Sequence, residues 1–393
     1  MQIEITEDDM TAARDLRRRL HAHPELSGQE FTTAATIAAE MRAAGADEVI
    51  EGLGGTGVAA EFRGAEAGPC LMIRAELDAL PIIETSGVAW SSGRPGVAHL
   101  CGHDGHMAIL VALARALGRG LPQGRVVLLF QPAEEDGAGA KAVLADPRTA
   151  ELAPDLVVSL HNLPGLPLGQ VALAEGPMGC ASRGMQIRLT GREAHASSPE
   201  HGISPRRALA QLIEGLTALA EGAFPSENFA LVTVAGVSMG GTAFGVAPGR
   251  GELRATLRTL TDARMERLIA EAERMVQDAA EADGLTVEIA WHEVFEATSN
   301  DPEAVALLRR ALDVAGVVHG PEGQPWRPSE DFGRLGALAP AAMLFLGSGE
   351  NQPPLHDPRF DFPDDLIGVG ARTFAAAVEV SQGSPLPPAS PSI

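Results

Sequence analysis

Three things are scarce in this sequence, and each scarcity excludes a class of protein. Only three cysteines occur, an odd number without the spacing of a disulfide framework, which favours a reducing cytosol. No apolar run approaches the roughly 20 residues that a membrane-spanning helix needs. The first ten residues are acidic and lack the apolar segment of a secretory signal. We therefore expect a cytoplasmic protein.

Basic side chains are also few. With 30 Lys and Arg against 52 Asp and Glu, the formal net charge is −22. A surface of that sign repels phosphate backbones and anionic lipid, so we expect neither nucleic acid nor a membrane as a partner. The apolar fraction of 45% is ordinary for a compact globular chain, and a length of 393 residues favours two domains over one.

The apolar pattern predicts an α/β domain that is interrupted by an insertion. Early in the chain, short β-rich runs alternate with helical stretches, as in a sheet covered by helices. These segments are strands at 58–62, 70–76, 125–131 and 156–160, and a helix at 105–117. Longer strands and two helices follow, at 185–189, 231–237, 253–260, 205–221 and 262–283. From Asn300 the first pattern resumes, with a strand at 342–346 and a last helix at 363–380.

These patterns predict the domain boundaries. We expect residues 1–180 and 294–383 to form one domain, residues 181–293 a smaller α+β domain, and residues 384–393 a disordered proline-rich tail. Two helix starts have the spacing of a capping box, Thr6 with Asp9 and Ser27 with Glu30. The second of these helices should end at Gly45.

The densest chemical signal is the segment from Cys101 to His106, which reads Cys-Gly-His-Asp-Gly-His. Thiolate and imidazole are both good ligands for zinc-like ions, and a glycine-spaced loop lets Cys101 and His103 point at one centre. Taken alone, the segment is equally compatible with a turn that holds a buried thiol and a helix-capping histidine.

A second signal is the pair Glu134 and Glu135, which follows the apolar run 126–130. Adjacent carboxylates at the end of a strand point in different directions, so one can bind a metal while the other acts as a base. The alternative is a solvated acidic loop that continues into Asp136.

Two single histidines are candidate ligands because of their positions in the chain. His161 follows a predicted strand, and His356 precedes the last predicted helix. Either could be a surface histidine. However, Cys101, Glu135 and His161 all lie at or just past the ends of predicted strands, where open α/β sheets collect ligands.

Two other motifs are weaker. Residues 52–57 match the dinucleotide fingerprint G-x-G-x-x-G, but a strand rather than a helix is predicted to follow, so we expect a hairpin connection there. His195 lies in the inserted segment and would alone be a structural or surface histidine. Ser197 and Ser198 lack the Gly-x-Ser-x-Gly context of a serine nucleophile.

Taken in order, these segments resemble the M20 metallopeptidase family, specifically its aminoacylase and hippurate hydrolase branch. The matching segments are residues 20–26, 74–81, 101–106, 131–135, 160–162, 194–196, 329–332 and 355–357. The resemblance implies an α/β catalytic domain with a central mixed sheet and a dinuclear metal centre. It also implies an inserted, smaller α+β lid domain that often mediates dimerisation, so we expect a homodimer or a dimer-based oligomer.

The resemblance also implies roles for individual residues. Glu134 would be the general base and acid, and Asp78 an orienting carboxylate beside the metals. His195 would reach the substrate oxyanion when the lid closes, from the same or the partner subunit. The ligands of two divalent transition-metal ions, with Cys101 as the bridge, would be Cys101, His103, Glu135, His161 and His356. Zinc, manganese, cobalt and nickel all suit such mixed ligands.

Three positions depart from the family's pattern. Glu76 stands where an aspartate is usual, and Gly245 stands where many relatives have a substrate-holding asparagine. Pro199 is followed by Glu200 rather than directly by a histidine. Arg258 is retained as a candidate partner for a substrate carboxylate.

The expected activity is metal-dependent hydrolysis of the amide bond of a small N-acylated amino acid or a related N-acyl amine. The nearest alternative is a dipeptidase or carboxypeptidase of the same family. A non-catalytic metal-binding or small-molecule-binding relative is another. A cysteine nucleophile at Cys101 paired with His103 is a third, and it would predict sensitivity to alkylation and indifference to chelators.

Overall fold

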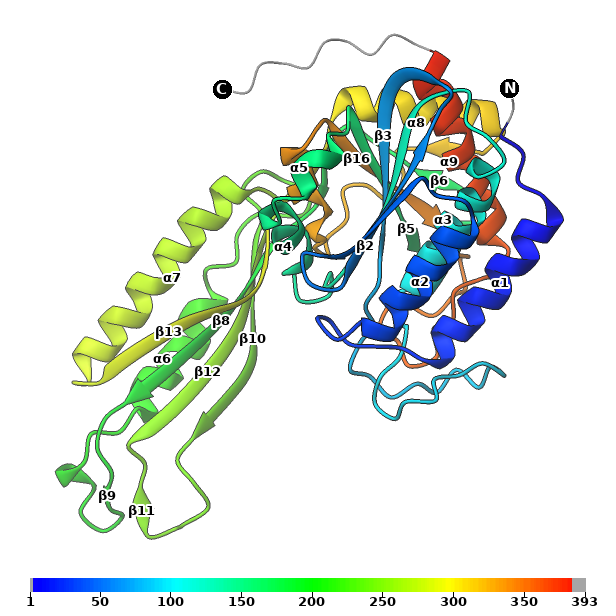
Figure 1. Ribbon diagram of the computed structural model, residues 1–393. Coiled ribbons are helices and arrows are strands. Elements are labelled where there is room, and N and C mark those ends of the chain that lie inside the picture. The colour runs from blue at the N-terminus through cyan, green and yellow to red at the C-terminus, as the bar shows by residue number, and fades with distance from the viewer. Residues whose placement is uncertain (1–2, 384–393) are drawn as a thin grey trace. The chain divides into compact units, whose positions relative to one another are not determined.

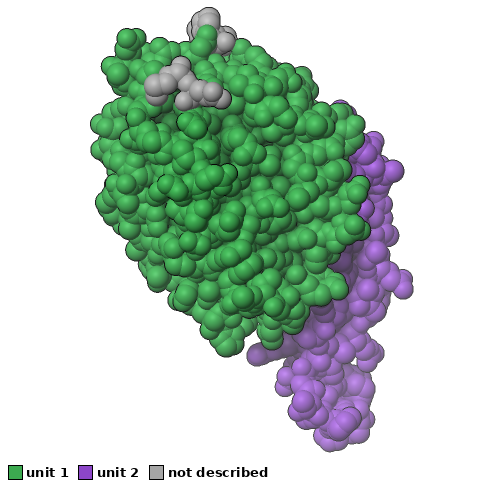
Figure 2. All heavy atoms as spheres, turned by 90° about the vertical axis from the view of Figure 1, so that its right-hand side faces the viewer, with its two compact units in different colours: residues 1–178, 299–324, 331–393 green, residues 179–298, 325–330 purple. Residues whose placement is uncertain are grey.

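The computed structural model describes residues 3–383, and the chain divides into two compact units (Figures 1 and 2). Unit 1 comprises residues 1–178, 299–324 and 331–393, and unit 2 comprises residues 179–298 and 325–330. The predicted tail, 384–393, lies outside the described residues. Within residues 3–383, no helix combines the length and the apolar character that crossing a membrane requires.

Unit 1 is built on a mixed eight-stranded sheet with the order β1-β2-β4-β3-β5-β16-β6-β15. The central strands β4, β3, β5 and β16 run parallel to one another. Such strands are buried on both faces and therefore read as continuous apolar runs. The strands are β1 (Glu48–Leu53), β2 (Gly57–Arg63), β3 (Glu66–Glu76), β4 (Gln123–Gln131), β5 (Leu156–Leu163), β6 (Val171–Ala172), β15 (His319–Gly320) and β16 (Ala341–Gly347).

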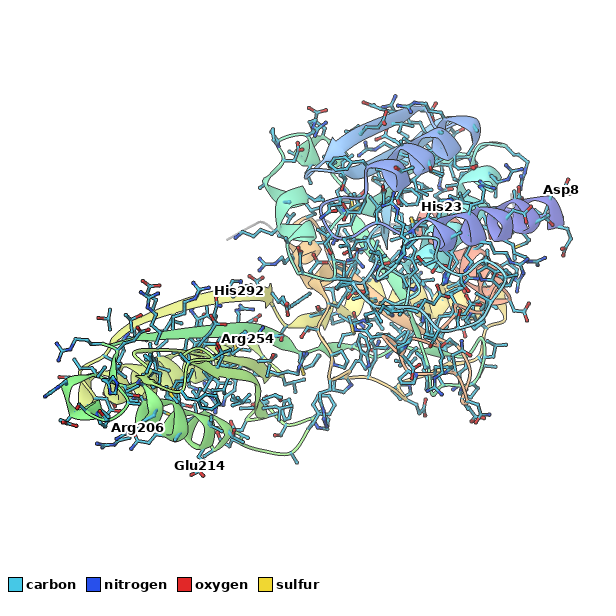
Figure 3. All side chains as sticks on the ribbon, turned by 90° about the horizontal axis from the view of Figure 1, so that it is seen from below. Asp8, His23, Arg206, Glu214, Arg254 and His292 are labelled. Carbon is cyan, nitrogen blue, oxygen red and sulfur yellow. The ribbon has the colours of Figure 1, made fainter. Side chains whose placement is uncertain are left out.

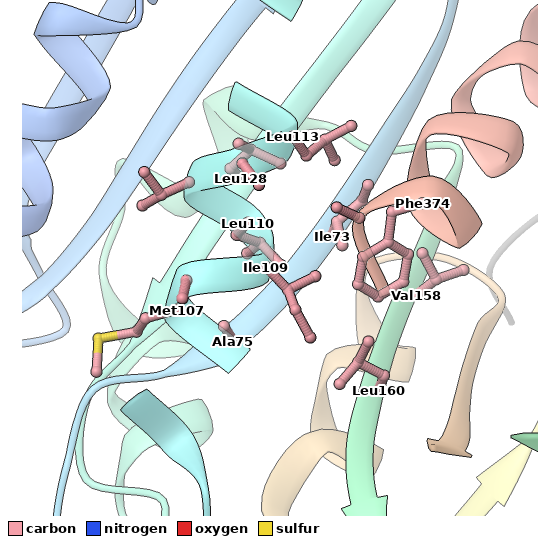
Figure 4. Close-up of a cluster of buried hydrophobic side chains, with 14 of the residues drawn as sticks. Ile73, Ala75, Met107, Ile109, Leu110, Leu113, Leu128, Val158, Leu160 and Phe374 are labelled. Atoms are coloured by element: carbon pink, nitrogen blue, oxygen red, sulfur yellow. The ribbon is translucent and has the colours of Figure 1, made fainter. Parts of the chain in front are cut away.

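Helix α3 (His103–Leu117) is the centre of the core of unit 1. All of its residues except Arg115 are buried, because α1 (Glu7–Ala22), α9 (Leu366–Gly383) and strand β3 all contact it. Figure 4 shows Ile109 and Leu110 of this helix in one buried cluster with Ile73 and Phe374. The remaining helices are α2 (Phe31–Ala43), α4 (Gly139–Ala145), α5 (Thr149–Leu152) and α8 (Pro302–Ala315). A helix held on all sides gives a rigid base to the loop at its N-terminus.

Unit 2 is an antiparallel four-stranded sheet with two helices on one face. The strand order is β10-β12-β8-β13, and α6 (Arg206–Thr217) and α7 (Asp262–Ala282) pack on it through Leu212 and Leu268. The strands are β8 (Ala181–Thr190), β10 (Ala230–Met239), β12 (Arg250–Thr259) and β13 (Thr286–Phe295). The other face carries polar side chains such as Arg254 and His292 (Figure 3). A two-stranded ribbon joins β9 (Ala194–His195) to β11 (Val246–Ala247).

The mixed α/β fold and its main elements confirm the predictions from sequence. Every strand and helix predicted by its range is present within a few residues, and the capping box of Thr6 and Asp9 is formed. Residues 52–57 form the predicted hairpin connection between β1 and β2, with positive φ at Gly54 and Gly55. Strands β1 and β13 were not predicted.

Candidate metal centre

The carboxyl ends of three parallel strands bring the predicted acidic and histidine residues to one edge of the sheet. Asp78 follows β3, Glu134 and Glu135 follow β4, and His161 lies near the end of β5. Because neighbouring parallel strands end at the same edge, side chains far apart in sequence meet there.

The loop from Cys101 to His103 enters this edge at the N-terminus of α3. Gly102 is the N-cap residue and has a φ of 96°, in the left-handed region that favours glycine. A Cβ atom at Gly102 would collide with the side-chain oxygen of Asn162. Only glycine therefore fits between Cys101 and His103 without a shift of buried neighbours.

The five predicted metal ligands form overlapping groups. Their ligand atoms lie within 4.8 Å of one another in the group Cys101, His103 and His161, and again in the group Cys101, Glu135 and His356. Cys101 belongs to both groups. The Sγ atom of Cys101 is 3.4 Å from His161 Nε2, and His356 Nε2 is 3.6 Å from Glu135 Oε2. The structure thus brings the five side chains together around Cys101.

Hydrogen bonds fix the tautomers of two of these histidines. His103 Nδ1 lies 2.9 Å from the backbone oxygen of Asp78, and His161 Nδ1 lies 2.8 Å from that of Asn162. A carbonyl oxygen only accepts, so each Nδ1 must donate, and in the neutral ring Nε2 keeps its lone pair for a metal.

The surroundings of His103 Nε2 test whether a cation would fit. This atom is buried and makes no hydrogen bond with any residue in the range 3–383, while oxygens of Glu134 and Glu135 lie 3.8 and 3.9 Å away. Convergent imidazole, thiol and carboxylate groups are the donors that zinc-like ions prefer. The residues present therefore fit a divalent transition-metal ion.

The charges around the site shift the pKa values of its members. Burial opposes the charged form of His103, but the hydrogen bond that His103 donates to Asp78 and the charges of Glu76 and Glu135 raise the pKa of His103 to about 10. Burial lowers the pKa of His161 well below its usual value, so this ring is neutral. Burial would raise the pKa of Asp78, yet hydrogen bonds from His103 and from the backbone of Glu135 lower it. Asp78 thus stays an anion that orients both neighbours.

A second buried network adjoins the centre. His106 lies 2.7 Å from Glu76 through Nδ1 and 2.7 Å from Asn162 through Nε2. Arg74 contacts Glu76 and also donates to Asp331 over 2.8 Å. Although burial would raise it, the charge of Arg74 and that of His106 hold the pKa of Glu76 well below its usual value. Glu76, in place of the usual aspartate, therefore acts here as a buried link between a cation and a histidine.

A third group of charges secures the start of α3. Asp104 is fully buried, 2.8 Å from Arg17 Nε and 2.9 Å from His21 Nδ1. His21 Nε2 lies 3.1 Å from Glu84. Sequence reasoning assigned no role to these residues. His21 and Asp104 lie inside matched segments, whereas Arg17 and Glu84 lie outside them and had no signal in the sequence.

The predicted capping box of Ser27 and Glu30 is wrong. Helix α2 does begin after Glu30, but no side chain caps it. Instead, the Ser27 hydroxyl donates to Asp78 Oδ2 over 2.7 Å, and the Glu30 carboxylate accepts from the backbone of Ala133 over 2.8 Å. Both side chains bind residues just past the strand ends that carry the candidate site. These long-range hydrogen bonds form in place of the local cap.

The remaining two predicted site residues belong to unit 2. His195 is exposed on β9, its Nδ1 atom is 2.7 Å from the hydroxyl of Ser197, and its backbone pairs with Val246. Arg258, on β12, donates to Ser329 Oγ over 2.6 Å and to the backbone oxygen of Arg327 over 3.1 Å. Neither His195 nor Arg258 belongs to the groups of candidate metal ligands.

Comparison with known proteins identifies the family of this chain. The model of peptidase family M20/M25/M40 matches residues 72–380. An N-acetylcysteine deacetylase of Bacillus subtilis is 32% identical over 92% of this chain and 94% of its own length. A hippurate hydrolase of Campylobacter jejuni is 30% identical over 92% of this chain and 94% of its own.

A solved structure has the same fold. It is a dinuclear metal-binding peptidase of the M20 family from Bacillus subtilis, 28% identical, with a TM-score of 0.79. The match covers 96% of this chain and 99% of the other. The likeness thus extends over both units.

Proposed function

Because the chain belongs to peptidase family M20/M25/M40, we propose that it is a metal-dependent amidohydrolase acting on a small N-acylated amino acid or a related N-acyl amine. The reaction breaks the amide bond and releases a carboxylate and an amine. The observation that carries this proposal is the pair Glu134 and Glu135 beside His103, since one carboxylate can serve as a ligand and the other as a base.

Five side chains are assigned to the cofactor. Cys101, His103, Glu135, His161 and His356 would hold two divalent transition-metal ions, with Cys101 shared, and zinc, manganese, cobalt and nickel suit this donor set. When bound, the ions would polarise the substrate carbonyl and lower the pKa of a water molecule. Asp78 orients His103 through two contacts and so supports the ligand set.

The chain's own groups carry the proton. Glu134 accepts a proton from the attacking water, whose oxygen forms the new bond to the amide carbon. As the carbon–nitrogen bond breaks, Glu134 passes this proton to the departing nitrogen, so the amine leaves neutral. The other proton of the water stays on the new carboxylic acid, which then loses it to solvent and becomes the carboxylate. We assign His195 to the carbonyl oxygen, where a donor stabilises the developing negative charge. Arg258 is assigned to a carboxylate of the substrate.

We also propose that unit 1 is the catalytic domain and that unit 2 serves as a lid and mediates a homodimer in the cytoplasm. Two features of unit 2 support self-association. Its sheet has β10 and β13 as edge strands, and edge strands readily pair with another chain. Large apolar side chains are exposed on β10 and beyond it, at Val237, Met239, Phe244 and Val246. Light scattering that finds a monomer would contradict this assignment.

The test combines metal content, a substrate panel and Glu134→Gln. Elemental analysis should find about two ions per chain, and N-acetyl or N-benzoyl amino acids should be cleaved unless a chelator is present. The variant should keep its ions and lose at least about 100-fold in kcat, as expected for a general base. Preference for dipeptides would favour the dipeptidase or carboxypeptidase alternative. Turnover that resists chelation but not alkylation would favour the Cys101 nucleophile.

A further inference from the structure

Glu30 is a buried carboxylate with no part in the mechanism above. Its side chain is fully buried, just before α2. Oε1 accepts hydrogen bonds from the backbone N–H groups of Gly28 (2.9 Å) and Ala133 (2.8 Å), and Oε2 accepts one from the Thr56 hydroxyl (2.7 Å). One carboxylate therefore joins three separate segments of the chain.

Ala133 is the unusual partner in this set. Its φ is 49°, in the left-handed region where a residue with a Cβ atom is strained by about 1–2 kcal/mol. It directly precedes Glu134, so the conformation of Ala133 sets the direction in which the Glu134 side chain leaves the backbone. Such strain persists only where neighbouring groups hold it in place. The hydrogen bond from the Ala133 amide to Glu30 is one such constraint, and that from Gly139 N to Ala133 O (2.9 Å) is another.

We propose that Glu30 is a positioning residue that holds the strained backbone of Ala133 and thereby aims Glu134 at the substrate. The proposal rests on the role of Glu134 as base in the proposed function. Glu30 belongs to none of the candidate ligand groups. Its effect on Glu134 is transmitted by the backbone of Ala133, whose amide it binds directly.

The length and the charge of the Glu30 side chain can be tested separately. Glutamine has the length of glutamate, so its oxygen can still accept from both backbone amides while its NH2 group meets the Thr56 hydroxyl. Aspartate keeps a carboxylate but is one methylene shorter, and it cannot span Ala133 and Thr56 together. A positioning role therefore requires Glu30→Gln to work and Glu30→Asp to fail, whereas a role for the negative charge requires the reverse.

Glu25 offers a matched control. It is also a buried glutamate, 4% exposed, and it also accepts from a backbone amide, that of Thr33 in α2, over 2.8 Å. Glu25→Asp should lower the melting temperature, as Glu30→Asp should, yet keep kcat within about twofold. Comparing Glu25→Asp with Glu30→Asp therefore distinguishes a loss of stability at α2 from a change in the direction of the Glu134 side chain.

The experiment measures kcat, KM, metal content and hydrogen–deuterium exchange of residues 131–137 in each purified variant. Glu30→Asp should lose about 10- to 100-fold in kcat with little change in KM or metal content, because small misplacements of a reacting group cost this much. Its 131–137 peptide should exchange faster. Glu30→Gln should stay within about threefold of the parent in kcat and keep its protection.

A second substitution adds a rescue. Glycine adopts positive φ without strain, so Ala133→Gly added to Glu30→Asp should restore part of the lost kcat. Wild-type kcat and exchange in Glu30→Asp, or an equal loss of kcat in Glu30→Gln, would overturn the proposal. If the Glu30 proposal fails in this way while Glu134→Gln is inactive in the same assay, the proposed function still stands. A fully active Glu134→Gln would overturn the proposed function itself.

Discussion

Replacing Gly102 by alanine would place a methyl group against Asn162, between two residues that we assign to metal binding. Asn162 cannot simply retreat, because it is fully buried and its Oδ1 atom is 2.7 Å from His106 Nε2. The alanine must therefore either strain the loop or break that contact. In both cases the side chains of Cys101 and His103 would move relative to each other.

The size of the effect follows from two contributions. A left-handed backbone costs a residue with a Cβ atom about 1–2 kcal/mol. Overpacking a buried site costs about 1–3 kcal/mol more. Gly87→Ala isolates the first contribution, since Gly87 also has positive φ (76°) but a Cβ atom there would meet nothing within 4 Å. At roughly 2 °C per kcal/mol, Gly102→Ala should melt roughly 2–6 °C below Gly87→Ala.

The assay is thermal unfolding of both variants with and without added metal, together with titration of the metal-free proteins. Gly102→Ala should bind metal at least about tenfold more weakly, in the range seen when groups that orient ligands are removed. Gly87→Ala should bind as the parent does. Equal melting temperatures for the two variants with unchanged metal affinity would refute the steric argument and the assignment of this loop.

Three further predictions concern the supporting contacts. Burial opposes the charged form of His21, but Asp104 and Glu84 together raise the pKa of His21 to about 9. The stabilisation by His21 should be complete below about pH 6.5 and lost as the pH rises through 9, about 3 kcal/mol in all, and His21→Gln should flatten this decline in thermal unfolding. Ser27→Ala removes one hydrogen bond to the buried carboxylate of Asp78 and should lower kcat about 3- to 10-fold in steady-state kinetics, with the melting temperature lower by only a few degrees. An unchanged kcat would exclude a role for that bond. Cys101→Ser replaces a soft thiolate by a poor ligand, so elemental analysis should find less bound metal, and full occupancy would remove Cys101 from the ligand set.

The fold could be predicted where one face or both faces of an element are buried. Strands β3, β4 and β5 contain the apolar runs 70–73, 126–130 and 156–158, and α3 is apolar from 107 to 114, so their patterns predict buried elements. Strands β1 and β13 are edge strands with charged residues in their sequences, Glu48 and Glu288 among them, and their pattern resembles that of loops. What fixes them is pairing with a neighbour, which the local sequence does not reveal.

The candidate site could be predicted as a set of residues but not as a network. Glu135 and His161 follow from strand ends, because topology alone brings such positions together. The predicted strand end at Cys101 is wrong, since β3 ends at Glu76 and Cys101 lies in the loop directly before α3. The spacing of Ser27 and Glu30 gave the wrong partner, since a capping box and a long-range contact look identical over four residues. Glu30 meets an amide 103 residues away, and no local rule encodes that distance. The roles of His195 and Arg258 stay predictions.

The divided course of unit 1 along the chain also bears on how the protein is made. Strand β16 completes the sheet between β5 and β6, yet it is synthesised after the whole of residues 179–298. At bacterial or eukaryotic elongation rates, roughly 5–20 residues per second, the apolar edge of β5 waits on the order of ten seconds or more for its neighbour. Helix α9, which covers α3, emerges later still. Unit 2 can therefore fold on the ribosome first, and the exposed edge of β5 is the surface that chaperones would need to protect in the meantime.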